Sequence, residues 1–142
     1  MRMDLKHVLV LAHCIFGLAF AATPVATLRA ASLDGKVFVV DSGPKGQPAD
    51  EKDDVLTFRE GRFHSKSCDK YGFGTAAYTT TNEGGNVVFT TETTSEKQGR
   101  LAWRGKIEGG TIEGTVVHYR KPGFFNRNPE PRELWFKGRV KE

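Results

Sequence analysis

Cysteine is almost absent from this 142-residue chain, which contains only Cys14 near its start and Cys68 in its middle. Cys14 lies in an N-terminal run that we expect to be removed, so Cys68 would be the one thiol of the mature protein. A single cysteine cannot form a disulfide within its own chain. The fold is therefore predicted to depend on core packing. Cys68 is either a buried thiol, a free reactive thiol or a link to another molecule.

The sequence also lacks the motifs of common catalytic, cofactor and metal sites. It contains no Gly-x-Ser-x-Gly, no Ser-x-x-Lys and no phosphate-binding glycine loop. It contains no Cys-x-x-Cys or His-x-His, and the acidic stretch Ala49 to Asp54 does not have the oxygen spacing of a calcium loop. We therefore predict no cofactor and no metal, and we interpret the acidic stretch as a solvated loop.

Charge of one sign does not dominate the chain, which carries 21 Lys and Arg against 17 Asp and Glu. Without the first 21 residues, 19 basic and 16 acidic side chains remain, a net charge of +3 with both signs interspersed. A nucleic-acid-binding protein usually carries its basic residues on one face. Nucleic acid is therefore not an expected partner.

Only one long apolar run is present, Val8 to Phe20, and it ends in the small-x-small pattern Ala19-Phe20-Ala21. A basic start, such a run and such an ending are typical of a secretory signal peptide. A membrane anchor is the alternative, but the run is shorter than the roughly 20 residues of a span. We predict a signal peptide over 1–21, a tether over 22–32, a barrel domain over 33–142, and a periplasmic or secreted location.

Helical periodicity is absent from Leu33 onward. Short segments rich in Val, Thr, Phe, Tyr and Trp alternate with glycine turns, which indicates an all-β fold. An eight-stranded antiparallel up-and-down barrel leaves no exposed edge, so it is favoured over the alternative, a β-sandwich. The strands are predicted at about 36–41, 54–59, 62–66, 75–81, 86–95, 100–108, 111–119 and 133–141.

Two glycine turns fix the register of their hairpins. Gly109-Gly110 suits a two-residue turn, and Glu60-Gly61 makes a second one. Apolar residues then fall on one face, and a shift of one residue would invert that pattern. The predicted cross-strand pairs are Ile107 with Ile112, Gly105 with Gly114, Trp103 with Val116, Leu101 with His118, Lys106 with Glu113, and Phe58 with Phe63.

The connections of such a meander alternate between the two ends of the barrel. The short-turn end would carry the turns 60–61, 82–85 and 109–110, and the open end the connections 42–53, 67–74, 96–99 and 120–132. Long loops in a compact domain are usually functional or disordered. Inward residues near the open end are small and half polar: Ser65, Thr91, Thr93, Leu101, His118 and Leu134, with Tyr78 at mid-level. Either that end holds a ligand, or Trp103 and Phe136 fill the space.

This layout resembles the lipocalin and calycin group of small secreted barrels, which bind ligands at an open mouth. The segment LDGKVF is similar to the first strand of that group, although the usual Gly-x-Trp is here Gly35-Lys36-Val37. The runs YGFG, TTETTS and LAWRGKIEGGTIEG also resemble short exported bacterial proteins of lipocalin-like type. The resemblance covers Leu33 to Lys141 and implies a fold and a compartment, but no catalytic residue.

Three functions are consistent with this sequence. The first is a binding module for a small, partly apolar ligand, with Tyr71, Phe73, Phe124 and Phe125 as an apolar rim and Tyr78, Thr91, Thr93 and His118 as hydrogen-bonding groups. Ser65 and Trp103 complete this predicted site.

The second function is an envelope structural or protein-interaction module with a filled core. The basic loop around Phe124 and Phe125 would then contact a protein or a membrane surface. An outward Trp135 would contact a protein or pack against the tether at 23–32. The third is an enzyme with Cys68 as nucleophile and His118 as base, which requires the loop 67–74 to fold over the mouth. We expect no enzyme, since no recognised cysteine-enzyme signature surrounds Cys68.

Overall fold

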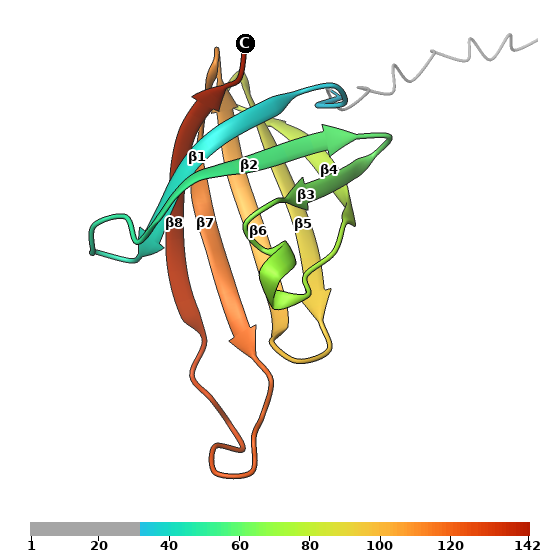
Figure 1. Ribbon diagram of the computed structural model, residues 1–142. Coiled ribbons are helices and arrows are strands. Elements are labelled where there is room, and N and C mark those ends of the chain that lie inside the picture. Colours follow the sequence, from blue (N-terminus) through green and yellow to red (C-terminus); the bar gives the residue numbers. More distant parts are fainter. Residues whose placement is uncertain (1–31) are drawn as a thin grey trace, which may run out of the picture.

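The computed structural model describes residues 32–142 and folds them into a closed barrel of eight antiparallel strands (Figure 1). The strands pair in chain order, and β8 closes the ring on β1. The predicted up-and-down barrel is confirmed, and the sandwich alternative is wrong. The elements are β1 Val37–Pro44, β2 Glu51–Arg59, β3 Arg62–Ser65, the 3-10 helix η1 Asp69–Tyr71, β4 Ala76–Glu83, β5 Asn86–Ser95, β6 Gly99–Glu108, β7 Thr111–Arg120 and β8 Arg132–Val140.

The predicted signal peptide and the predicted tether, except for Ser32, lie outside the described residues. Between residues 32 and 142, no helix has the length and apolar character needed to cross a membrane. The described chain is thus the barrel with its loops.

The hairpin registers predicted from the glycine turns are confirmed. Around Gly109-Gly110, every predicted pair of β6 with β7 is observed, from Ile107 with Ile112 to Leu101 with His118. Phe58 pairs with Phe63 between β2 and β3. The polar and apolar faces therefore lie where the alternation of the sequence places them.

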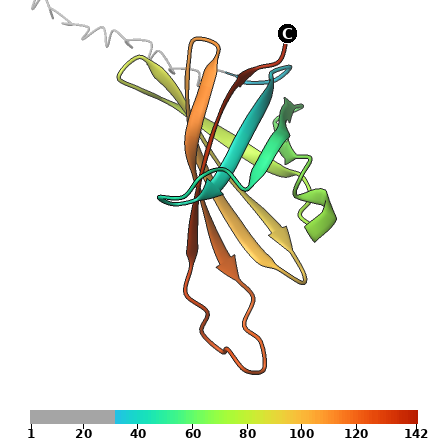
Figure 2. The ribbon, with the colours of Figure 1, turned by 60° about the vertical axis from the view of Figure 1, so that its left-hand side comes forward.

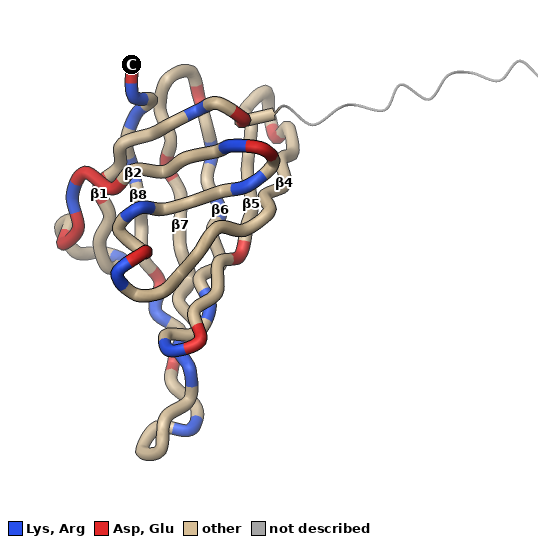
Figure 3. Tube along the Cα trace, turned by 45° about the vertical axis from the view of Figure 1, so that its right-hand side comes forward, with Lys and Arg blue, Asp and Glu red and all other residues tan. Residues whose placement is uncertain are grey.

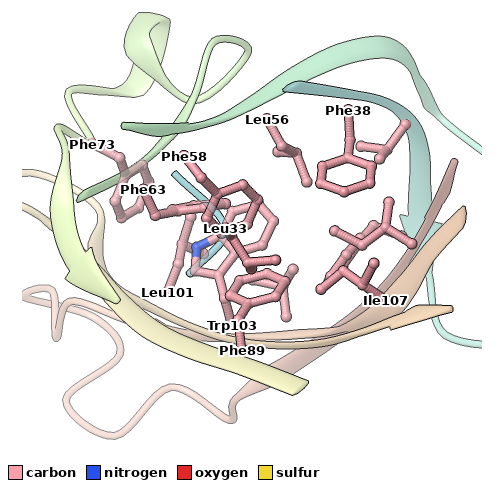
Figure 4. Close-up of a cluster of buried hydrophobic side chains, with 14 residues drawn as sticks. Leu33, Phe38, Leu56, Phe58, Phe63, Phe73, Phe89, Leu101, Trp103 and Ile107 are labelled. Carbon is pink, nitrogen blue, oxygen red and sulfur yellow. The ribbon is translucent and has the colours of Figure 1, made fainter. Parts of the chain in front are cut away.

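Aromatic side chains fill the barrel from the short-turn end to its middle (Figure 4). The Phe58 ring contacts the rings of Phe38, Phe63, Tyr78 and Phe89, at centroid distances between 4.9 and 6.0 Å. All four phenylalanines are fully buried. Burial of such a side chain contributes about 1.5–3 kcal/mol, so this cluster contributes strongly to the stability of the barrel.

The segment before β1 closes the short-turn end. The side chain of Leu33 is buried and lies in the middle of the ring of strands (Figure 4). Its backbone N–H donates to the Tyr78 hydroxyl at 3.1 Å, and that hydroxyl donates to Asp34 at 2.7 Å. Gly35 then joins the barrel through a hydrogen bond to the Phe58 carbonyl.

Glycines on the inner face leave room for Phe136 in the middle of the barrel. A Cβ atom at Gly105 or Gly114 would lie within 2.8 Å of the Phe136 ring. Phe136 packs against Trp103 at 5.6 Å between centroids, and both are buried. The middle of the barrel is therefore filled, and the space that remains inside lies nearer the open end.

Candidate functional site at the open end

An irregularity in β2 turns part of the acidic stretch toward the interior. Lys52 and Asp53 lie together opposite Asp41 of β1, which makes a β-bulge. Asp53 adopts a left-handed φ of 56°, and its N–H donates to the Asp41 carboxylate at 3.1 Å. Asp54 faces inward by its alternation with the buried Leu56 and Phe58, and the bulge resets that alternation, so that Glu51 lines the same cavity. For these two residues the solvated-loop interpretation was wrong, because Asp54 is buried inside the barrel and β2 begins at Glu51, earlier than predicted.

The cavity has a volume of about 380 Å³ and lies at the open end. Its floor is apolar and consists of Val40, Leu101, Trp103, Val116, Leu134 and Phe136. Its rim is polar and carries Ser42, Asp50, Glu51, Asp54, Ser67, Cys68, Gln98, His118 and Arg132. An apolar lining with a few polar groups is the usual composition of a small-molecule site.

The connection between β3 and β4, residues 66–75, folds over the mouth of this cavity and is called the mouth loop below. Phe73 is buried, and its ring meets that of His118 edge-on at a centroid distance of 6.0 Å. Tyr71 lines the cavity and remains half exposed. The hydroxyl of Ser95 donates to the Tyr71 carbonyl at 2.8 Å and so attaches this loop to the end of β5. Figure 1 shows η1 beside the open end of β5 and β6.

Asp54 anchors the first part of the same loop from inside the barrel. One carboxylate oxygen accepts a hydrogen bond from the Ser65 hydroxyl at 2.6 Å, and the other accepts one from the Ser67 N–H at 2.8 Å. Asp54 is only 6% exposed, so both bonds form away from bulk water. A buried carboxylate without such donors would be costly, which is why the two serines accompany it.

Cys68 and His118 line the same cavity, as the enzyme hypothesis requires. Burial raises the pKa of the Cys68 thiol, and the negative charges of Asp54 and Asp69 raise it further, against hydrogen bonding from Ser65. The Nε2–H of His118 donates to the Gln98 carbonyl at 2.9 Å. A catalytic cysteine needs a lowered pKa, so this environment favours an unreactive thiol.

Four of the predicted site residues come together at the cavity: Tyr71, Phe73, Trp103 and His118. Trp103 forms part of the floor, and its indole N–H donates to the Thr93 hydroxyl at 3.2 Å. The pairing of Leu101 with His118 places His118 on the inner side of β7, where alternation predicted it.

Four other predicted residues hold the barrel together and do not line the cavity. The Tyr78 hydroxyl is engaged at the short-turn end by Leu33 and Asp34. The Thr91 hydroxyl donates to the Ala77 carbonyl at 2.7 Å, and the Thr93 and Ser65 hydroxyls bond to Trp103 and Asp54. Alternation predicts the inward direction of a side chain, but not the bonds that occupy its hydroxyl.

Phe124 and Phe125 lie outside the cavity, in the loop between β7 and β8. They are 85% and 98% exposed, and their rings contact each other at 5.1 Å. Trp135 lies on the outer face of β8 and donates its indole N–H to the Gln47 carbonyl in the β1–β2 loop at 2.9 Å.

Sequence reasoning missed the charged part of the rim. Glu51 pairs with Lys70 of η1 at 2.9 Å, and Asp50 lies 3.8 Å from Arg132 at the start of β8. The density of acids between Ala49 and Asp54 was visible in the sequence, but the bulge that turns Glu51 inward was not. Across residues 32–142, no group of three or more His, Cys, Asp and Glu side chains is arranged to hold a metal ion.

A second hollow, of about 550 Å³, lies on the outer face of β6, β7 and β8. Its lining includes Val88, Thr115 and Trp135. Its charged side chains already pair, Arg104 with Glu83 at 2.7 Å and Lys106 with Glu113 at 3.4 Å. Exposed ion pairs of this kind are the ordinary surface of an antiparallel sheet. The interior cavity, with its buried floor, is therefore the stronger candidate site.

Comparisons with known proteins add no assignment to this geometry, since no protein-family model, no curated protein and no solved structure matches the chain. The eight-stranded antiparallel barrel is consistent with a lipocalin-like fold. The function must therefore be argued from the site.

Proposed function

We propose that this protein is a binding module that holds a small, partly apolar ligand in the cavity at its open end. The observation that supports this proposal is the division of the cavity into an apolar floor around Trp103 and a polar rim around Asp54. Removing apolar ligand surface from water on that floor would supply affinity, at about 25 cal/mol per Å². The rim would set the ligand's orientation.

The rim carboxylates suggest which polar group the ligand carries. Asp50, Glu51 and Asp54 face the cavity together with Arg132, so acids outnumber bases there. Asp54 already accepts from Ser65 and Ser67, but a carboxylate offers further lone pairs. A ligand with an apolar body and an amine or hydroxyl that donates hydrogen bonds fits this arrangement.

The proposal includes an exported location and a lipocalin-like kinship. The run Val8 to Phe20 and its small-x-small ending support export. The closed up-and-down barrel and the mouth loop at one end support the kinship. Intact mass of the protein from its own source would test the first point, since cleavage near Ala21 removes a defined segment.

The decisive experiment has two parts. Native mass spectrometry of the chain from Ala22 onward, purified mildly from its source, should show a discrete extra mass that is lost on denaturation. A titration with aminoanthracene, which combines an apolar ring system with one amine, should quench the fluorescence of Trp103 at the floor of the cavity.

Adjacent residues of β7 provide a matched pair of variants. Val116 lines the cavity and is buried, whereas Val117 is its neighbour on the outer face. Val116→Phe should abolish aminoanthracene binding, and Val117→Phe should leave it unchanged. If Val116→Phe does not fold, Ser42→Phe fills the same cavity from β1. Equal binding by all folded variants would show that the dye does not use this cavity.

Among the remaining functions, the enzyme with Cys68 as nucleophile has the weakest support, because burial raises the pKa of that thiol. A structural module without a ligand predicts a native mass equal to that of the chain alone, and no binding of aminoanthracene. The two parts of the experiment therefore separate it from the binding module.

A further inference from the structure

The loop between β7 and β8 is the longest projection from the barrel (Figures 1 and 2). It carries Phe124 and Phe125 at its tip, where they are among the most exposed large apolar side chains of residues 32–142. The two rings contact each other edge-on at 5.1 Å. Exposure of two adjacent phenylalanines to water is unfavourable, so a surface that covers them would gain free energy.

The geometry points to a lipid bilayer with anionic headgroups as the surface that this loop binds. The argument rests on the shape of the loop, on its charge and on its place beside the cavity. It does not depend on the proposed function, because Phe124 and Phe125 lie outside the cavity.

The shape of the loop suits insertion rather than a flat interface. A stable protein–protein interface buries about 800 Å² on each partner, which requires a broad patch. Two rings at the tip of a narrow loop cannot provide that area, but they are sufficient to enter the headgroup region of a bilayer. Pro122, Pro129 and Pro131 restrict the backbone, and the Gly123 N–H donates to the Asn126 carbonyl at 2.9 Å. The tip is thus held in a position that projects away from the barrel.

The base of the loop is attached to the neighbouring hairpin. The Lys121 N–H donates to the Gln98 carbonyl at 3.3 Å, and the Lys121 ammonium donates to the Glu96 carbonyl at 2.6 Å. Both partners belong to the short β5–β6 connection. A projecting tip on a fixed base is suited to carry the rings into a membrane.

Basic side chains surround the apolar tip. Residues 120–132 contain four basic residues and one acid, a net charge of +3. Within residues 32–142, no carboxylate forms a salt bridge with Arg120, Lys121 or Arg127. The tip itself is uncharged, with basic residues on its flanks (Figure 3). Apolar residues flanked by cations without a carboxylate partner match the interface of an anionic membrane, where the cations meet lipid phosphates.

The base of the loop borders the rim of the cavity. His118 and Arg132 pair at the base of the loop, and both line the rim of the cavity. A loop that inserts its tip therefore turns the mouth of the barrel toward the bilayer. An amphipathic molecule that partitions into the lipid would meet the cavity there.

Vesicle flotation tests the assignment. The protein used in this test starts at Ala22, because the run Val8 to Phe20 would bind lipid by itself. The barrel of residues 33–142 contains its complete ring of strands and its own core, so it is expected to fold without that run. It should float with vesicles of phosphatidylcholine and phosphatidylglycerol in equal parts, and much less with phosphatidylcholine alone. Added salt should weaken the binding.

Variants of the loop separate insertion from general charge attraction. Phe124→Ser with Phe125→Ser should weaken binding by more than about 100-fold, whereas the conservative pair Phe124→Leu and Phe125→Leu should retain it. Lys121→Gln with Arg127→Gln should weaken binding by roughly 20- to 30-fold. Lys137→Gln with Arg139→Gln removes two charges from the outer face of β8 instead, and it should have little effect.

A local probe completes the test. Phe124→Trp should show a blue shift on anionic vesicles and strong quenching by lipids brominated in their chains, beyond the signal of the wild-type chain. No flotation of the wild-type chain, or equal flotation of the serine pair, would overturn the assignment and leave a protein partner as the explanation for the exposed rings. Flotation with an unquenched indole would also overturn insertion of the tip.

Discussion

The ring of Phe136 lies directly over Gly114, its partner on β7, so that a methyl group at Gly114 would come within 2.7 Å of the ring. The same methyl group would lie 2.6 Å from the Gly105 Cα atom on β6. Three strands and one aromatic ring thus meet where two glycines face each other. This contact closes the space below the cavity and separates it from the filled part of the barrel.

Gly114→Ala should therefore destabilise the barrel. Backbone atoms cannot move away from the added methyl group without shifting β6 or β7, and overpacking of this kind costs about 1–3 kcal/mol or more. Urea unfolding followed by circular dichroism measures the loss. Gly74→Ala is the matched control, because its added methyl group meets nothing within 4 Å. Equal midpoints for the two variants would contradict the packing described here.

Asp54→Ala should destabilise the protein and loosen the mouth loop. The change leaves the Ser65 hydroxyl and the Ser67 N–H without their acceptor inside the barrel. A buried donor without a partner costs about 1–3 kcal/mol. Urea unfolding measures the free energy, and amide hydrogen exchange should show the loss of protection at Ser67.

Asp50→Ala provides the comparison for Asp54, since its carboxylate is more than half exposed and lies 3.8 Å from the Arg132 guanidinium. Exposed pairs of this kind contribute at most about 1 kcal/mol. A similar loss of stability in both variants would mean that Asp54 does not hold the loop as described.

The Cys68 thiol should react slowly with iodoacetamide at neutral pH in the folded protein. Burial raises its pKa, with Asp54 and Asp69 adding to the shift, so the thiolate is scarce. The reaction should become faster as the pH rises above the ordinary thiol pKa of about 8.5. Mass spectrometry of the alkylated chain follows the rate. The chain unfolded in urea is the control, and an equally fast reaction of the folded chain at neutral pH would revive the enzyme hypothesis.

The same shift links Cys68 to stability at alkaline pH. The pKa of Cys68 is raised in the folded state, so the folded protein favours the protonated thiol. The stability that this preference gives the folded protein is complete below the unfolded pKa of about 8.5 and is lost as the pH rises through the folded pKa. The unfolding free energy of Cys68→Ser should fall less steeply above that pH than the free energy of the wild-type chain. Parallel curves would contradict the shift.

The Tyr78→Phe variant should lose less stability than the wild-type chain as the pH falls into the acid range. The Tyr78 hydroxyl is the main reason that the pKa of Asp34 is lowered, and the Gly61 N–H is the second. A carboxyl with a lowered folded pKa stabilises above its unfolded pKa of about 3.9, and the effect is lost as the pH falls through the folded pKa. Urea midpoints measured from neutral pH to about pH 2 should therefore fall less in the variant than in the wild-type chain.

Tyr119→Phe is the control for Tyr78→Phe, since it also removes a tyrosine hydroxyl. The Tyr119 ring stacks on the Arg100 guanidinium at 4.0 Å and lies on the outer face of β7. Its acid profile should follow that of the wild-type chain. If the urea midpoints of Tyr78→Phe fell with pH as steeply as those of the wild-type chain, the contact between Tyr78 and Asp34 would not contribute to stability in acid.

Much of the candidate site could be predicted as a location but not as a set of contacts. The topology placed the loop 67–74 at the open end, and Tyr71, Phe73 and His118 do line the cavity there. Thr91 and Thr93 point inward as predicted, but their hydroxyls bond to Ala77 and Trp103. Such bonds depend on the distance between neighbouring strands and on rotamers, which the spacing of residues in a sequence does not contain.

The all-β class, the strand order and the registers around Glu60-Gly61 and Gly109-Gly110 could all be predicted from the residues alone. These follow from local causes, because side chains alternate with a period of two and a two-residue turn permits one register. Three features required the folded chain: a bulge at Asp53 turns Glu51 toward the cavity, Phe136 occupies the space over Gly114, and the mouth loop covers His118. Each of these results from packing between segments distant along the chain, where one added residue or one missing side chain changes what lies inside.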